Sequence, residues 1–289
     1  MDLYSSIVQL RAEGRRGALA TIINVRGSIP AYETAKMLIR DDGTIVGTIG
    51  GGCVEAEVWQ VAKQVMQDEK PQTLTFHLNQ DPRYDNGLVC GGTLEVFIEP
   101  VVPTPLLYIF GAGHVSQCLY QAARLAGFDV TVIDDREQYA NRERFPDARD
   151  IFADDYPRIC AQLAPTENAF LVIVTRGHKD DMKILRWAID TPARFIGMIG
   201  SERKFLAIRK AFEEEDIPPQ KLDRVYSPVG IDIGAITPAE IAIAVVAEMI
   251  AARRKSKAIL PHLAWTKKKV SEREPETNET ATPAKEENK

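Results

Sequence analysis

Residues 106–136 contain the pattern that most constrains the fold of this chain. The apolar run Leu106–Phe110 predicts a strand buried on both faces of a sheet, and a glycine turn at 111–113 follows it. Residues 114–126 have apolar side chains at helical spacing, and a second apolar strand then ends at Asp134. This order of strand, glycine turn, helix, strand and acid is typical of a nucleotide-binding crossover in a doubly wound sheet.

Each position of this crossover has a chemical role. Gly111 allows the tight turn, and Gly113 lets backbone N–H groups approach a pyrophosphate at the positive end of the helix that begins at His114. Ser116 replaces the third glycine of the pattern, and Asp134 could accept hydrogen bonds from ribose hydroxyls. We therefore expect a phosphate-bearing ligand here; the alternative is a turn that only packs.

Length and composition limit the class of protein. A chain of 289 residues suggests about two domains, and 45% hydrophobic with 27% charged residues is ordinary for a soluble protein. A net charge of −5 argues against a nucleic-acid partner, and no apolar run has the roughly 20 residues of a membrane span. The N-terminus has no secretory signal pattern, and the four cysteines form no C-x-x-C pair. We expect a cytoplasmic protein.

The chain is predicted to be α/β in two domains. Residues 1–99 predict a small α+β domain, residues 100–105 a proline-rich linker, and residues 106–265 a Rossmann-like doubly wound parallel sheet. Within that last domain, residues 237–240 form a capping box that opens a final helix. The charged segment 266–289 lacks the apolar residues needed for a core and is predicted to be disordered.

A second glycine-rich turn precedes a predicted helix in the N-terminal domain. Gly50, Gly51 and Gly52 would let the backbone approach a ligand, and Cys53 at the helix start would have its thiolate stabilised by the helix dipole. Glu55 opposes phosphate binding here, because a carboxylate in the first turn already complements the dipole. A turn that packs against a neighbour is equally consistent with the residues.

Cys90 lies beside two glycines just before another predicted strand. Cys53 and Cys90 are candidate catalytic, sulfur-handling or metal-binding thiols, although neither has an evident histidine base. Structural roles for both thiols remain open.

Polar side chains also follow two later strands of the C-terminal domain. Ser201 is a predicted helix N-cap, which places Arg203 and Lys204 in the first helical turn, where cations oppose the dipole by about 0.3–1 kcal/mol each. A bound anion would remove this conflict, so we predict ligand contacts there rather than solvated charges. His178 follows another strand and is either a ligand contact or a surface histidine.

Several segments, taken in order, resemble the XdhC/CoxI family, the accessory proteins of molybdenum hydroxylases such as xanthine dehydrogenase. The resemblance rests on the sequences GSIP, AKMLIRDDG, GTIGGGCVE, CGG, FGAGHV, VIDDR, IGMIGSERK and PVGIDIGAITPAEIA. At 31–34 the chain has Ala-Tyr-Glu-Thr where the family pattern has a basic residue and a glycine, so an anion contact there is in doubt.

The resemblance implies a chaperone that binds molybdenum cofactor, as molybdopterin or its dinucleotide form, supports its sulfuration and delivers it to an apo-molybdenum hydroxylase. A cysteine desulfurase would be a further partner, and the protein would be a homodimer. Cys53 and Cys90 would then face the molybdenum of the bound cofactor. The resemblance does not imply that members of the family catalyse a reaction.

Two other classes remain open from the residues. The glycine turn and Asp134 are compatible with an NAD(P)-dependent oxidoreductase, although no recognisable catalytic domain follows the crossover. A nucleotide- or redox-sensing module without turnover is a third possibility.

Overall fold

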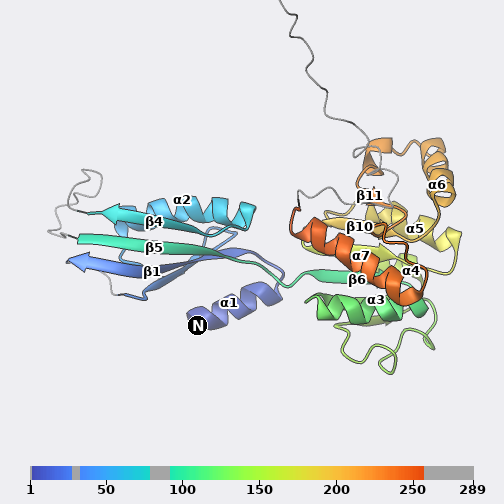
Figure 1. Ribbon diagram of the computed structural model, residues 1–289, viewed down its shortest axis with the longest axis horizontal. Coiled ribbons are helices and arrows are strands. Elements are labelled where there is room, and N and C mark those ends of the chain that lie inside the picture. Colours follow the sequence, from blue (N-terminus) through green and yellow to red (C-terminus); the bar gives the residue numbers. More distant parts are fainter. Residues whose placement is uncertain (1, 28–32, 79–91, 257–289) are drawn as a thin grey trace, which may run out of the picture. The chain divides into compact units, whose positions relative to one another are not determined.

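The computed structural model describes residues 2–27, 33–78 and 92–256. The chain divides into two compact units, Met1–Leu106 and Leu107–Lys289. Figure 1 shows the helices and strands of both units.

The N-terminal unit is a five-stranded antiparallel sheet with one helix on each face. Its strand order is β3-β2-β1-β5-β4. The strands are β1 (Gly17–Gly27), β2 (Lys36–Arg40), β3 (Ile45–Gly47), β4 (Gln72–His77) and β5 (Gly92–Val101), and the helices are α1 (Leu3–Ala12) and α2 (Gly52–Asp68).

Alternation along β1 explains why both faces are covered. Ala20 and Ile22 belong to the core beneath α2, whereas Leu19 packs with Leu10 of α1 on the other face. The buried residues of α2 recur at the spacing of an amphipathic helix and pack into the first of these cores; they are Val54, Val58, Ala62 and Val65.

Strand β5 extends into the segment predicted as a proline-rich linker. It continues through Pro100 to Val101, because both residues pair with β1, opposite Ala18 and Gly17. On its other side β5 pairs with β4 only as far as Ile98, so the missing N–H of Pro100 interrupts no pairing on that side.

The C-terminal unit is a six-stranded sheet in the order β11-β10-β9-β6-β7-β8. The strands are β6 (Leu106–Phe110), β7 (Asp129–Asp134), β8 (Ile151–Ala153), β9 (Ala169–Ile173), β10 (Phe195–Met198) and β11 (Val225–Tyr226). The helices are α3 (His114–Leu125), α4 (Tyr156–Gln162), α5 (His178–Ala188), α6 (Glu202–Glu214) and α7 (Pro238–Arg253), with a 3-10 turn, η2, at Pro219–Lys221.

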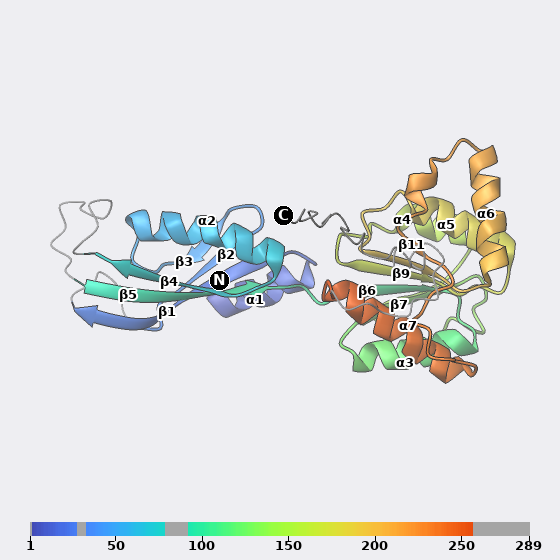
Figure 2. The same cartoon turned by 45° about the horizontal axis from the view of Figure 1, so that its top comes forward.

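Helices cover both faces of this sheet, as Figure 2 shows: α3 and α7 lie on one face, and α4, α5 and α6 lie on the other. The predicted doubly wound parallel architecture is confirmed by this arrangement and by the parallel pairing of β9, β10 and β11 and of β7 and β8.

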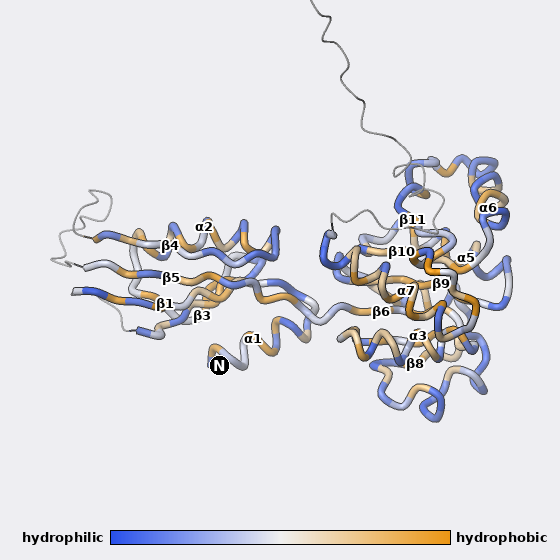
Figure 3. Tube along the Cα trace, in the orientation of Figure 1, coloured by the Kyte–Doolittle hydropathy of each residue, from blue (hydrophilic) through white to orange (hydrophobic). Residues whose placement is uncertain are grey.

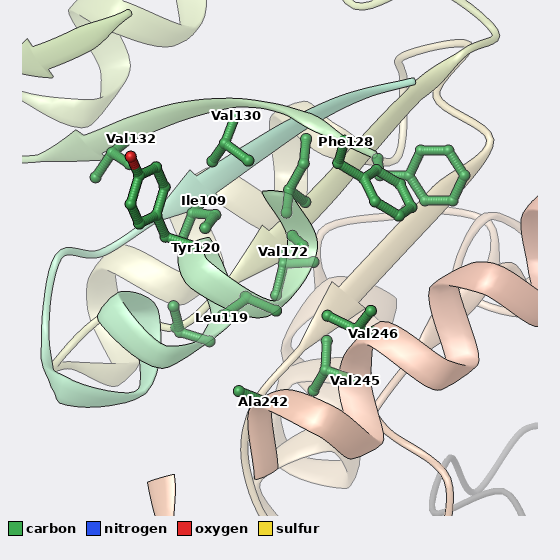
Figure 4. Close-up of a cluster of buried hydrophobic side chains, with 14 of the residues drawn as sticks. Ile109, Leu119, Tyr120, Phe128, Val130, Val132, Val172, Ala242, Val245 and Val246 are labelled. Carbon is green, nitrogen blue, oxygen red and sulfur yellow. The ribbon is translucent and has the colours of Figure 1, made fainter. Parts of the chain in front are cut away.

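Each face has its own apolar core. Leu119 and Tyr120 of α3 and Val245 and Val246 of α7 belong to one cluster on the first face (Figure 4). On the opposite face, Ile184 and Phe205 of α5 and α6 pack onto the sheet. Strand β9 is apolar along its whole length because both of its faces are buried (Figure 3).

The helix termini follow their sequence signals closely. Thr237 and Glu240 form the predicted capping box at the start of α7, in which the Thr237 hydroxyl accepts from the Glu240 N–H and the Glu240 carboxylate accepts from the Thr237 N–H. Ser201 is the N-cap of α6, as predicted.

Candidate functional site

The strand order places a crevice beside β6. From this strand the chain moves to β7 and β8 on one side and later returns to β9, β10 and β11 on the other. Ligands of open α/β sheets bind at the carboxyl ends of the strands where the order reverses, which here means the loops after β6 and β9. The residues predicted for this unit follow the strands of the same edge: Gly111, Gly113 and His114 after β6, Asp134 at the end of β7, His178 after β9, and Ser201, Arg203 and Lys204 after β10.

Gly111 and Gly113 have different physical reasons to be glycine. A Cβ on Gly111 would lie 2.4 Å from the carbonyl oxygen of Val174, and its φ of +112° is unfavourable for other residues. Gly113 has a φ of −76° and no atom within 4 Å of the position of a Cβ. Gly111 is therefore required for packing, whereas the space in front of Gly113 is open.

The first turn of α3 begins beside that open space. Gly113 is the N-cap of the helix, and no side chain caps the first turn. The hydroxyl of Ser116 in this turn is buried and has no hydrogen-bond partner among the described residues. Uncapped N–H groups at the positive end of a helix form a suitable anion-binding position.

Asp134 is bonded to the protein itself. Its Oδ2 accepts from the N–H of Ala112 at 2.7 Å, and its Oδ1 accepts from the N–H of Arg136 at 3.0 Å. The Arg136 guanidinium adds a bidentate contact, with Nε to Oδ1 at 2.8 Å and Nη2 to Oδ2 at 3.0 Å. Burial would raise the pKa of Asp134, but the hydrogen bonds from Arg136 and Ala112 outweigh it and hold the pKa below its ordinary value. The predicted contact between Asp134 and a ribose stays a prediction, and it would compete with these bonds.

Three arginines surround the glycine turn, and the sequence interpretation missed all of them. Arg136 binds Asp134 as described, and Arg144 donates from Nη2 to the carbonyl oxygen of Ala112 at 3.2 Å. Arg176, after β9, binds Asp135, after β7, at 2.8 Å. Because β6 lies between β7 and β9, this ion pair joins the two loops that flank the glycine turn.

Two of these arginines could have been found from their positions just after predicted strands. Arg136 and Arg176 each lie within three residues of the end of a buried strand, where a polar side chain reaches the sheet edge. Arg144 lies in the long loop between β7 and β8, and nothing in its local sequence indicates that it approaches Ala112.

Lys204 has a counter-ion within the protein, so the helix-dipole argument for a bound anion does not apply to it, and its contact with a ligand stays a prediction. Its Nζ pairs with the carboxylate of Asp181, which is fully buried in α5, and also donates to the carbonyl oxygen of Ile199 at 3.1 Å. The charge that opposes the α6 dipole is thus compensated internally. Thr175 donates a further hydrogen bond to Asp181 at 2.6 Å, so this network ties the loop after β9 to α5 and α6.

A cavity of about 400 Å³ brings the later predicted residues together. It lies between the N-terminal parts of α5 and α6 and is lined by His178, Met182, Ser201, Arg203, Lys204, Ala207 and Ile208. His178 and Arg203 are exposed, so both can meet a ligand that enters from solvent. The predicted site residues therefore form two groups, one at the glycine turn and one at this cavity.

The carboxylate of Glu55 accepts hydrogen bonds from the glycine loop of the N-terminal unit. Gly50, Gly51 and Gly52 have φ values of +118°, +82° and +65°. The Oε1 of Glu55 accepts from the N–H groups of Ile49 and Gly51, both at 3.1 Å. Two backbone donors of this loop are thus used by Glu55, in agreement with the expectation for Glu55 from the sequence.

Cys53, at the start of α2, is exposed. Cys90 lies outside the described residues, so its position relative to Cys53 stays a prediction. Within residues 2–27, 33–78 and 92–256, no three His, Cys, Asp or Glu side chains are grouped so that they could bind a metal ion. In the same ranges, no helix has the length and apolar character needed to cross a membrane.

Comparison with known proteins gives the family. The model of the XdhC Rossmann domain matches residues 107–249, and that of the XdhC and CoxI family matches residues 10–77. Uncharacterized protein YqeB of Escherichia coli (strain K12) is 34% identical over 251 residues, which cover 86% of this chain and 46% of YqeB. A probable xanthine dehydrogenase subunit of Bacillus subtilis (strain 168) is 30% identical over 332 residues, 88% of this chain and 98% of that protein.

Two further similarities concern smaller or looser matches. The molybdenum cofactor insertion chaperone PaoD of E. coli (strain K12) is 29% identical over 89 residues, 31% of this chain and 28% of PaoD. The crystal structure of a xanthine dehydrogenase from Bacillus halodurans matches with a TM-score of 0.48 and 26% identity over 89% of this chain and 97% of that one.

The fold and the glycine turn define a protein with a C-terminal Rossmann domain preceded by a small α+β unit. With family models over both units and a relative aligned over nearly its whole length, the chain belongs to the XdhC/CoxI family. It spans about half the length of YqeB.

Proposed function

We propose that this protein is an accessory chaperone that binds molybdenum cofactor and delivers it to a molybdenum hydroxylase of the xanthine dehydrogenase type. The observation that carries the proposal is the uncapped N-terminus of α3 behind Gly113, at the strand reversal of an XdhC-type Rossmann domain. The names of two relatives, a molybdenum cofactor insertion chaperone and a probable subunit of xanthine dehydrogenase, support the same function.

The residues at the turn fit the phosphate of such a cofactor. The first-turn N–H groups of α3 would donate to phosphate oxygens, and the open space at Gly113 would admit them. Two buried polar atoms beside the turn, the Ser116 hydroxyl and the Arg144 Nε, have no hydrogen-bond partner in the part of the chain that the structure describes. Unpaired polar atoms of this kind are expected where a ligand completes a site.

The cavity between α5 and α6 would take a second part of the ligand. Ser201 and Arg203 offer a hydroxyl and a guanidinium, and Met182 and Ile208 give the cavity apolar walls against which a flat ring can lie. His178 lies at the mouth of the same cavity. When bound, the cofactor would supply the molybdenum centre that the client enzyme uses; the residues of this chain would hold and shield it.

Sulfuration of the cofactor, with a cysteine desulfurase as partner, is the finer part of this proposal. Cys53 supports it because its thiol is exposed at the start of α2, where a partner can reach it. Cys53→Ser or Cys90→Ser should leave cofactor binding intact and reduce sulfuration of the client, measured as cyanide-releasable sulfur. A loss of binding with unchanged sulfuration would contradict these roles.

The direct test of the proposal is ligand binding by the purified full-length protein. Molybdopterin should bind in a 1:1 ratio with a dissociation constant in the micromolar range or tighter, and the protein should activate an apo-hydroxylase when loaded. Absence of molybdopterin binding, together with tight NAD(P) binding, would favour the oxidoreductase alternative, for which the glycine turn and strand order are the supporting features.

A further inference from the structure

In this structure Asp134 has no acceptor capacity left for a ribose. An ionised carboxylate has about four lone-pair positions. The four bonds from Ala112 and Arg136 use two positions on each oxygen, and Asp134 is 1% exposed. A nucleoside diol could bind this carboxylate only after Arg136 had been displaced.

Arg136 is held in place by more than its charge. Its guanidinium lies over the ring of Tyr139, 3.9 Å from the ring centroid, while its backbone carbonyl accepts from the N–H groups of Tyr139 and Ala140. The side chain is 23% exposed, so most of it is packed against its surroundings. The arginine therefore occupies the position at the end of β7 where a dinucleotide site would receive its ribose.

We propose that Arg136 closes the ribose subsite of the glycine turn, so that the turn selects a ligand ending in a phosphomonoester over one in which a nucleoside follows the phosphate. The identity of the ligand rests on the proposed function. For molybdenum cofactor, a closed ribose subsite selects the pterin monophosphate form over the dinucleotide form. The phosphate would meet the N-terminus of α3, and Asp134 would hold the turn through Ala112 instead of binding a sugar.

A pair of nucleotides that differ only in the diol measures the ribose contact directly. ADP and 2′,3′-dideoxy-ADP should bind wild-type protein with dissociation constants within about twofold of each other. In Arg136→Ala the carboxylate becomes available, and ADP should then bind about tenfold or more tightly than the dideoxy form, as expected for a hydrogen bond to a charged group. Isothermal titration calorimetry of the full-length protein gives both ratios.

Two further variants make the measurement specific. Arg158→Ala removes the same charge from a side chain that is 74% exposed and pairs with Asp154 on the surface, so it should keep the wild-type ratio. Arg136→Lys keeps the charge but cannot form the bidentate contact, and it should give a ratio between those of wild type and Arg136→Ala. This variant decides the question if Arg136→Ala does not fold.

The binding results that support the proposal differ from those that overturn it. No measurable ADP binding by wild type, combined with diol-dependent binding by an Arg136 variant, also supports the proposal. A diol preference of about tenfold in wild type, or Arg136 variants without any diol preference, overturns it. Failure of wild type to bind molybdopterin would instead count against the proposed function, because the nucleotide ratios do not depend on that ligand.

Discussion

Gly111 and Gly113 provide a matched pair of single-residue tests. Gly111→Ala should lower the free energy of unfolding by at least about 2 kcal/mol, since its Cβ would meet the Val174 carbonyl oxygen at 2.4 Å and its φ is +112°. Gly113→Ala should change it by no more than about 0.5 kcal/mol, because no atom lies within 4 Å of its Cβ. Urea denaturation measures both, and equal losses would contradict the distinction.

The cysteines should differ sharply in reactivity. Cys160 is buried in α4, and burial raises the pKa of its thiol to about 12, so it stays protonated and shielded at neutral pH. Cys53 is exposed at the start of α2. Iodoacetamide labelling at pH 8, followed by peptide mass spectrometry, should modify Cys53 rapidly and Cys160 only after unfolding. Rapid labelling of Cys160 in the native protein would contradict its burial.

Asp134 should make stability depend on acid pH. Its pKa in the folded protein lies below its ordinary value of 3.8, so the charged carboxylate stabilises the fold fully above that pH. The contribution is lost as the pH falls from there through the lower folded value. The free energy of unfolding should therefore decrease more steeply below about pH 4 in wild type than in Asp134→Asn. Parallel curves for the two proteins would show that the bonds to Arg136 and Ala112 contribute nothing.

At the scale of elements, the Asp181–Lys204 pair fastens α6 to α5. Lys204→Met leaves the fully buried carboxylate of Asp181 without its cation and should destabilise the protein by about 3–5 kcal/mol. The double variant Asp181→Asn/Lys204→Met removes both charges and should recover a large part of that loss. Chemical denaturation of the single and double variants tests this. A mild effect of the single variant would mean that Asp181 finds another partner.

The helices and strands show which elements a sequence can predict. Strand β6 and the capping box of α7 were predicted because hydrophobic runs and capping residues act locally. The short elements β8 and β11 have three and two residues, too few for a periodic pattern to show. Their positions depend on pairing with β7 and β10, which are contacts between segments far apart in the chain.

The sequence predicts which loops form the candidate site but not the contacts between their side chains. The glycine turn and the strand ends indicate which loops meet, because parallel strands share one carboxyl edge. The partners of Lys204 and Asp134 were not evident. Asp181 is 23 residues before Lys204, and the bond from Ala112 to Asp134 joins the glycine turn to the end of β7; both are tertiary contacts. The helix dipole alone therefore predicted a ligand at Lys204, where the protein supplies its own carboxylate.

At the scale of the whole molecule, the chain combines two units with separate cores. The antiparallel sheet of the N-terminal unit supports the loop with Gly50 and Cys53, and the Rossmann domain supports the glycine turn and the cavity beside Arg203. In the proposed function, the Rossmann domain binds the cofactor and the N-terminal unit provides an exposed thiol. Both matched family models belong to XdhC-type proteins, which is consistent with this combination of units.

The central claim is that the phosphate of molybdenum cofactor binds at the N-terminus of α3, and Gly113→Asp tests it most directly. Gly113 is an N-cap in extended conformation, so an aspartate there should cap the helix and preserve or increase stability while placing its carboxylate where the phosphate would bind. Molybdopterin affinity should fall at least about tenfold relative to wild type, with an unchanged or higher melting temperature. Equal molybdopterin affinity in a correctly folded Gly113→Asp protein would contradict the claim.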